Sequence, residues 1–360
     1  MREPEPKDHD IATTITEGLP EADLGRLRRE TGRFHTPILS RSLFQIATSF
    51  GGFFATCAAM YWLAGISLWL PLALAPLAAG FLVRIFIIQH DCGHGSFFVS
   101  RRANEWLGMA CSVLTMTPFA SWRRQHAGHH GVWNDLDRRE SGADIYSFCL
   151  TVEEYRQLGV WGRFWYRATR HPVVANVVLP PLIFMVLYRL PFDMPKTWRR
   201  ERMQVHLTSL AILGLLTGLA LLIGLWPVLV VQLPVMMLAA IYGVWLFSVQ
   251  HRGEQTRWAR NKDWDPAVAA LHGSSYLGLP AVLQWFTGNI GFHHVHHMNP
   301  RVPNYRLQEC HDRLAGMHAA PRMSLWQGMK ALRFTLWDEA GNRMVRAGDV
   351  RLLAASPATA

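Results

Sequence analysis

The stretch His293-His294-Val295-His296-His297 places four histidines in five consecutive residues, and the arrangement of the whole chain can be worked out from it. Two earlier stretches have related spacings, residues 90–94 (HDCGH) and residues 126–130 (HAGHH). Histidines three or four residues apart share one face of a helix. Because neutral imidazole is the commonest metal ligand in proteins, the three clusters predict a shared metal site. Core histidines bonded to backbone groups are the alternative interpretation.

Eight of these histidines fit the spacings HxxxH, HxxHH and HxxHH. They are His90, His94, His126, His129, His130, His293, His296 and His297. A tetrahedral metal ion takes about four ligands, so eight or nine imidazoles predict two metals. Imidazole suits zinc, copper, iron and nickel, so the ligand type alone does not choose among them. The chain has no HExxH motif, which argues against a metalloprotease.

The composition indicates a membrane protein. Of 360 residues, 50% are hydrophobic and 17% are charged, and the apolar residues are concentrated in long runs. No nucleic-acid motif accompanies the net charge of +10, so we expect no nucleic-acid partner. The five cysteines are scattered and form no CxxC pair, which favours a reducing compartment. No short apolar leader with a cleavage site is apparent near residue 1.

Four apolar runs are long enough to cross a bilayer as helices, at residues 43–64, 68–88, 207–226 and 228–249. Consecutive runs form two hairpins, with turns expected at residues 65–67 and at Pro227. Arginines gather at the opposite ends of the hairpins. The positive-inside rule therefore places both termini and all the histidine clusters in the cytoplasm.

Two shorter apolar stretches, residues 106–120 and 172–188, are expected to be re-entrant or interfacial. If either crossed the bilayer, the histidine clusters would lie on opposite faces. We therefore expect an all-α integral membrane protein with a cytoplasmic helical cap that carries the metal site. Residues 1–42 are expected to form a cytoplasmic segment, residues 43–335 a single membrane domain and residues 336–360 a flexible tail.

These boxes, their order and their placement around two hairpins resemble the membrane fatty-acid desaturases, especially bacterial acyl-lipid enzymes of the delta-12 type. The resemblance covers roughly residues 40–315. It rests on residues 90–96 (HDCGHGS), 117–118 (TP), 245–251 (WLFSVQH) and 284–305, which run from Gln284 through the third box to Asn304-Tyr305. It implies two irons that use O₂ to introduce a double bond into a lipid-bound acyl chain. It also implies a bacterial inner-membrane location.

The resemblance adds a ninth ligand, His251, which follows the fourth apolar run. Family members commonly read Gln-His-Gln-Phe-Glu there, whereas this chain reads Gln-His-Arg-Gly-Glu at residues 250–254. Each ligand's outer ring nitrogen needs an acceptor. The candidate acceptors are the carboxylates beside the boxes: Asp91, Asp135, Asp137, Asp144 and Glu254. His294 falls outside the HxxHH spacing, so we expect it beside the ligands rather than among them.

No flavin, haem or nucleotide motif is present, so we expect electrons from an external, ferredoxin-like protein. A hydroxylase, ketolase or acetylenase on the same scaffold is an alternative that the boxes leave open. A metal transporter or metal-responsive protein is another. A transporter should carry ionisable residues at mid-membrane depth, and the four runs contain only Arg84, near an end. The double-bond position, the acyl-chain length, the acyl carrier and the oligomeric state stay open.

Overall fold

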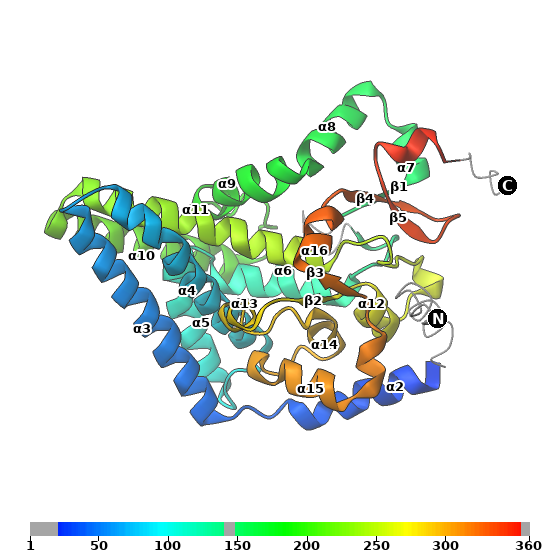
Figure 1. The fold of residues 1–360 in the computed structure, drawn as a ribbon, viewed down its shortest axis with the longest axis horizontal. Helices are drawn as coiled ribbons and strands as arrows, with labels where there is room; N and C mark the ends of the chain where they lie inside the picture. Colours follow the sequence, from blue (N-terminus) through cyan, green and yellow to red (C-terminus); the bar gives the residue numbers. More distant parts are fainter. Residues whose placement is uncertain (1–20, 140–147, 354–360) are drawn as a thin grey trace, which may run out of the picture.

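The computed structural model describes residues 21–139 and 148–353. Four long helices gather at one end of the molecule, and short helices and strands occupy the other (Figure 1). The long helices are α3 (Leu39–Ala64), α4 (Trp69–His94), α10 (Arg199–Ile223) and α11 (Leu225–Gln250). Each is long and apolar enough to cross a membrane, which confirms the four expected spans and the all-α membrane fold.

Helix α4 is the innermost of the four, and it packs against α3, α11 and α5 (Arg101–Thr115). Its close approach to α3 depends on Gly52, where an added Cβ would lie 2.2 Å from the Phe81 ring. The turn of the second hairpin is at Gly224, whose φ of 89° suits glycine. The expectation of a turn at Pro227 is therefore wrong. Pro227 is the third residue of α11, where its missing N–H breaks no helical hydrogen bond.

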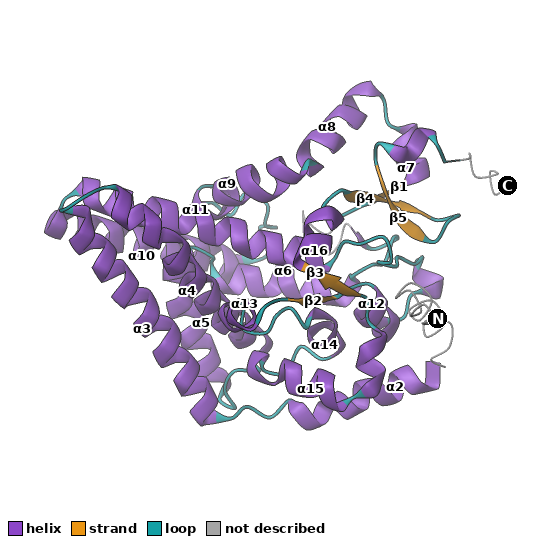
Figure 2. Ribbon diagram, viewed as in Figure 1, coloured by secondary structure: helices purple, strands orange, loops and turns teal. Residues whose placement is uncertain are grey.

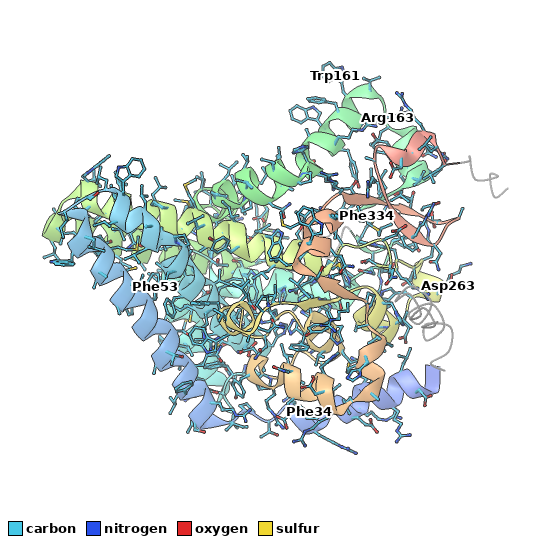
Figure 3. The ribbon with its side chains drawn as sticks, viewed as in Figure 1. Phe34, Phe53, Trp161, Arg163, Asp263 and Phe334 are labelled. Carbon is cyan, nitrogen blue, oxygen red and sulfur yellow. The ribbon has the colours of Figure 1, made fainter. Side chains whose placement is uncertain are left out.

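The shorter apolar stretches form no long helix. Helix α5 has 15 residues, so it is about 22 Å long and shorter than the roughly 30 Å of hydrocarbon. The second stretch is broken into η3 (Val174–Val178), α9 (Leu179–Met185) and η4 (Leu187–Arg189). It follows α8 (Val160–Arg170) at a bend of 54°, as in a broken span or a re-entrant segment. Its interfacial placement stays a prediction. Trp161 projects from α8 (Figure 3) and is 76% exposed.

The remaining elements form a cap in which strands are few and short (Figure 2). Its larger helices are α2 (Glu21–Glu30), α6 (Phe119–Val132), α7 (Val152–Gln157), α12 (Pro266–His272), α13 (Ala281–Phe286), α14 (His293–Met298), α15 (Leu307–Arg313) and α16 (Leu325–Ala331). Single turns of helix lie between them, namely η1 (Thr31–Phe34), η5 (Asn261–Asp263), η6 (Asn304–Arg306), η7 (Ala315–Ala319) and η8 (Asp349–Arg351).

Two small sheets complete the cap. Strand β2 (Tyr276–Gly278) pairs in parallel with β3 (Arg322–Ser324). The other sheet has the order β1-β4-β5, from β1 (Leu150–Thr151), β4 (Phe334–Asp338) and β5 (Arg343–Arg346).

The second sheet corrects the expectation of a flexible tail, at least for residues 336–353. Leu336 and Trp337 in β4 are 0% and 2% exposed. Asn342 takes a positive φ of 47° in the turn between β4 and β5. Burial of these large apolar side chains offsets the entropy lost when the segment is ordered.

Candidate metal centre

Four elements that are distant in sequence bring nine imidazoles together at the cap end of the long helices. They come from the last two turns of α4 and of α6, from the residue after α11 and from helix α14. These imidazoles belong to the eight box histidines and His251, the residues that the sequence singled out as ligands. They divide into two adjoining groups.

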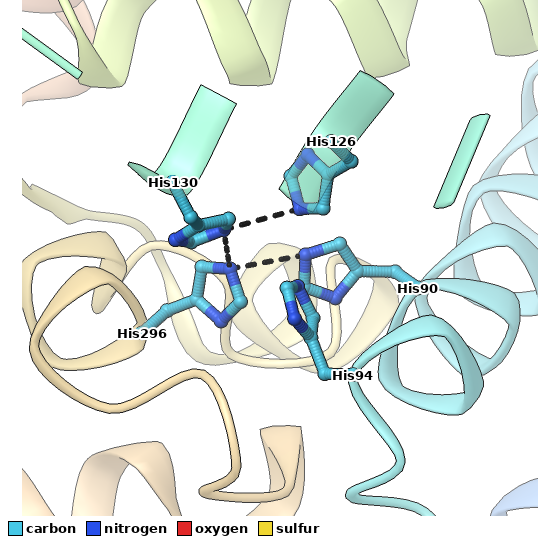
Figure 4. Close-up of side chains that lie close together, drawn as sticks. All are labelled: His90, His94, His126, His130 and His296. Atoms are coloured by element: carbon cyan, nitrogen blue, oxygen red, sulfur yellow. Dashed lines mark hydrogen bonds between the residues drawn. The ribbon is translucent and has the colours of Figure 1, made fainter. Parts of the chain in front are cut away.

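The first group contains five imidazoles, from His90, His94, His126, His130 and His296, with ligand atoms within 4.8 Å of one another (Figure 4). Its Nε2 atoms are closely spaced. His296 lies 3.1 Å from His90 and 3.0 Å from His130, and His130 lies 3.2 Å from His126. The fifth imidazole, His94, has a buried Nε2 without a hydrogen-bond partner among the described residues.

The second group is centred on His251. Its Nε2 lies 3.2 Å from that of His129, 2.9 Å from that of His293 and 3.2 Å from that of His297. His293 and His297 are themselves 3.2 Å apart at Nε2. His129, His251 and His297 form a mutually close set. The second group therefore offers four imidazoles.

Because of the HxxHH spacing, α6 and α14 each supply histidines to both groups. In α6, His126 and His130 are four residues apart and enter the first group, while His129 enters the second. In α14 the use is reversed, because His293 and His297 enter the second group and His296 enters the first. Adjacent residues on a helix diverge by about 100°, so each His-His pair can serve two neighbouring sites.

The spacing of the nitrogens fits a metal better than it fits hydrogen bonding. Each ring nitrogen carries at most one proton, so three Nε2 neighbours of His251 cannot all be paired by hydrogen bonds. Nitrogens that share a metal at about 2.1 Å lie about 3.0–3.4 Å apart in octahedral or tetrahedral geometry. The observed separations match that range, so the donor set fits two metal ions.

Burial favours the neutral form of most of these imidazoles, which is the form that metal ligation requires. Burial, with a smaller contribution from the nearby His90, lowers the pKa of His129 to about 3. Burial, assisted by the neighbouring imidazoles, also lowers the pKa of His126, His130, His251, His293, His296 and His297 well below the usual value. At neutral pH the lone pairs of these rings are therefore available.

Among the proposed acceptors that the structure describes, Asp91 is the one with a recorded contact to a box histidine. Its Oδ1 lies 3.2 Å from His90 Nδ1, which leaves His90 Nε2 to face the first group. Its Oδ2 accepts hydrogen bonds from the backbone and side-chain nitrogens of Asn304, at 2.7 and 2.8 Å. Asn304 in turn pairs with Gln45. Neither Asn304 nor Gln45 carries a spacing signal in the sequence, although Asn304 falls in the stretch that carries the resemblance.

The other proposed acceptors lie elsewhere. Asp135 accepts hydrogen bonds from Arg138 and from the backbone of residue 137, and Asp137 pairs with Arg260. Glu254 is mostly exposed and faces Arg343. Sequence proximity placed these three beside the boxes, but the chain turns away from the metal groups after α6 and α11. Asp144 lies outside the described residues.

His294 points away from both groups, as its place outside the HxxHH spacing predicts. Its Nε2 lies 3.0 Å from His311 Nδ1.

Aromatic rings cover the centre. Trp122 stacks on His126 with centroids 4.6 Å apart, and Trp133 lies 3.9 Å from His251. These two tryptophan rings limit the access of water to the ligands.

The fatty acid desaturase family model matches residues 67–328. A fatty acid desaturase of Bacillus subtilis is 39% identical over 89% of this chain and 90% of that protein. An sn-1 oleoyl-lipid 12-desaturase of Synechocystis is 27% identical over 70% of this chain and 71% of its own length. An sn-1 acyl-lipid omega-3 desaturase (ferredoxin) of Synechocystis is 26% identical over 62% of this chain and 61% of its own length.

Proposed function

This chain belongs to the fatty acid desaturase family of membrane oxidoreductases, and we propose that it introduces a double bond into a lipid-bound acyl chain with O₂ and two irons. The observation that carries the proposal is the convergence of nine imidazoles into two adjoining groups at the end of four apolar helices. The proposed reaction consumes O₂, two electrons and two protons, and forms one C=C bond and two waters.

In this proposal the first group holds one iron and the second group holds the other. When bound, the iron pair supplies the activation of O₂ and the oxidising power that no side chain provides. The protein's part is to position and shield. Asp91 fixes the tautomer and orientation of His90. Trp122 and Trp133 limit the water near the ligands.

The substrate and donor are proposed from the relatives. One relative is named as an oleoyl-lipid desaturase, and the name of another specifies ferredoxin. Lipid acyl chains in the bilayer would lie beside the four long helices, next to the centre. A ferredoxin-like donor would supply the electrons from outside the chain. The arginine-rich helix flanks support a bacterial inner-membrane location with the centre on the cytoplasmic side.

Fatty-acid profiling of a bacterial host tests this proposal. The host is supplied with iron and a ferredoxin system and expresses the wild type or His130→Ala. We expect a new unsaturated acyl chain in the membrane lipids with the wild type and none with the variant. A hydroxylated product in its place would refute desaturation in favour of the related oxygenation. Absence of any new product, with the wild type inserted and loaded with iron, would refute the whole assignment.

A further inference from the structure

A cavity of about 860 Å³ lies where α3 and α4 approach the metal centre. It falls in the size range of small-molecule sites. Residues from α3, α4, α13 and the segment that carries α14 and α15 line it. None of its lining residues is acidic, and two, Arg41 and Arg84, are arginine.

Arg84 is a buried cation in the wall of this cavity. It is 7% exposed, and no described carboxylate lies within 4 Å of it. Its guanidinium stacks on Trp285 at 3.9 Å and donates to the Trp285 carbonyl, while its buried Nε has no hydrogen-bond partner in the described part of the chain. Neither an aromatic ring nor a carbonyl carries a net negative charge. Burial of an uncompensated charge is strongly unfavourable, so the site calls for an anion.

A second buried polar group lines the same cavity. Gln284 is 8% exposed, and neither its amide nitrogen nor its amide oxygen has a hydrogen-bond partner among the described residues. Buried amides of this kind are nearly always paired in folded proteins. At the rim, Arg41 is exposed and adds a second positive charge. The cavity thus offers two cations and an unused amide.

The cavity adjoins both the metal centre and an apolar surface. Asn304 lines it and also donates to Asp91, the neighbour of His90. Phe292 lines it and directly precedes His293. On the outer side, Phe44 and Val282 are 65% and 67% exposed, as expected of side chains that face lipid. A ligand here would have its polar part beside Arg84, with apolar chains able to reach the bilayer and the centre.

We propose that this cavity binds the phosphate and glycerol ester of a phospholipid, with Arg84 and Arg41 holding the phosphate and Gln284 donating to an ester carbonyl. The inference rests on the proposed function and narrows its substrate from lipids in general to phosphate-bearing lipids. Guanidinium groups suit phosphate because their N–H groups match its oxygens. The two arginines of the cavity therefore favour binding of a phospholipid over an uncharged glycolipid.

The test measures lipid retention without turnover. Purified full-length protein is taken from nanodiscs that hold equal amounts of phosphatidylglycerol and monogalactosyl diacylglycerol with the same acyl chains, and bound lipid is counted by native mass spectrometry. We expect the wild type to retain phosphatidylglycerol and little galactolipid. Arg84→Gln should lower phosphatidylglycerol retention about tenfold, because it removes a charge-assisted contact. Arg41→Gln and Gln284→Leu should lower it less. Arg33→Gln, an exposed arginine outside the cavity, is the matched control and should retain lipid normally.

Equal retention of the two lipids by the wild type would overturn the proposal, as would unchanged retention in Arg84→Gln and Arg41→Gln. If Arg84→Gln fails to fold, the retention measured for Arg41→Gln and Gln284→Leu decides whether the cavity binds phospholipid. Inorganic phosphate serves as a competitor. If phosphate stabilises the purified protein but the protein retains no phosphatidylglycerol, the anion in the cavity does not come from a lipid. Because retention needs neither iron nor O₂, a protein that binds phospholipid but forms no double bond would refute the proposed function alone.

Discussion

At the scale of single residues, His94 and His294 form a matched pair. Both lie beside the centre, His94 partly buried and His294 fully buried, but His94 faces the first group whereas His294 contacts His311. We expect His94→Ala to lower the iron content of purified protein from about two per chain to about one or less, because the first iron loses a ligand. His294→Ala should keep about two. Elemental analysis measures both, and equal iron loss in the two variants would contradict the assignment.

The lowered pKa values of the buried box histidines predict how the stability of the metal-free protein responds to acid. Their pKa values are lowered in the folded state, so below about pH 6.5 the unfolded chain binds more protons than the folded one. Stability should therefore fall as the pH drops, by about 1.4 kcal/mol per pH unit for each imidazole that is protonated only in the unfolded chain. The thermal midpoint in detergent should decrease between about pH 7.5 and about pH 5.5.

His126→Phe provides the internal comparison for this pH effect. A phenyl ring can keep the stacking on Trp122 but cannot be protonated. The variant should show a shallower dependence of the thermal midpoint on pH than the metal-free wild type. A midpoint that is independent of pH in the metal-free wild type would show that the buried imidazoles do not titrate as inferred.

At the scale of elements, β4 anchors the end of the chain. Leu336 is fully buried and packs with Val152, Tyr155 and Val345. Leu336→Ala should lower the free energy of unfolding by about 2–4 kcal/mol, because it leaves a cavity. Leu352→Ala is the control, since Leu352 is 86% exposed and the change should cost little. Chemical denaturation in detergent compares them, and a tolerated Leu336→Ala would support the tail expected from sequence.

At the scale of the whole molecule, the proposed orientation places Ile66 outside the membrane and the cap inside. Cysteines introduced at Ile66, Arg102, Asp137, Arg199 and Lys262 test it, since these positions are exposed and the five native cysteines are buried. A membrane-impermeant reagent added outside intact cells should label only Ile66→Cys. External labelling at Asp137 would place part of the cap across about 30 Å of hydrocarbon from the rest. The orientation would then be wrong.

Much of this protein follows from sequence because the signals are local. The length of an uncharged run fixes whether a helix can span a bilayer, so all four long helices were predicted, with only the Gly224 turn misplaced. The spacing of histidines fixes which helix face they share, so the box residues could be named before their partners were known. His251 needed the family resemblance, since a lone histidine after a span carries no periodic signal.

Tertiary structure alone decided how the histidines divide, because the division depends on how four distant elements meet. Spacing cannot show that His129 joins His251 while its neighbour His130 joins His296. Nor can it show that Asp91 is held by Asn304, more than two hundred residues away, or that Arg84 lines a cavity without a counter-charge. Such contacts arise from the packing of α4 against segments near the end of the chain. Their energy is realised only when these segments fold together.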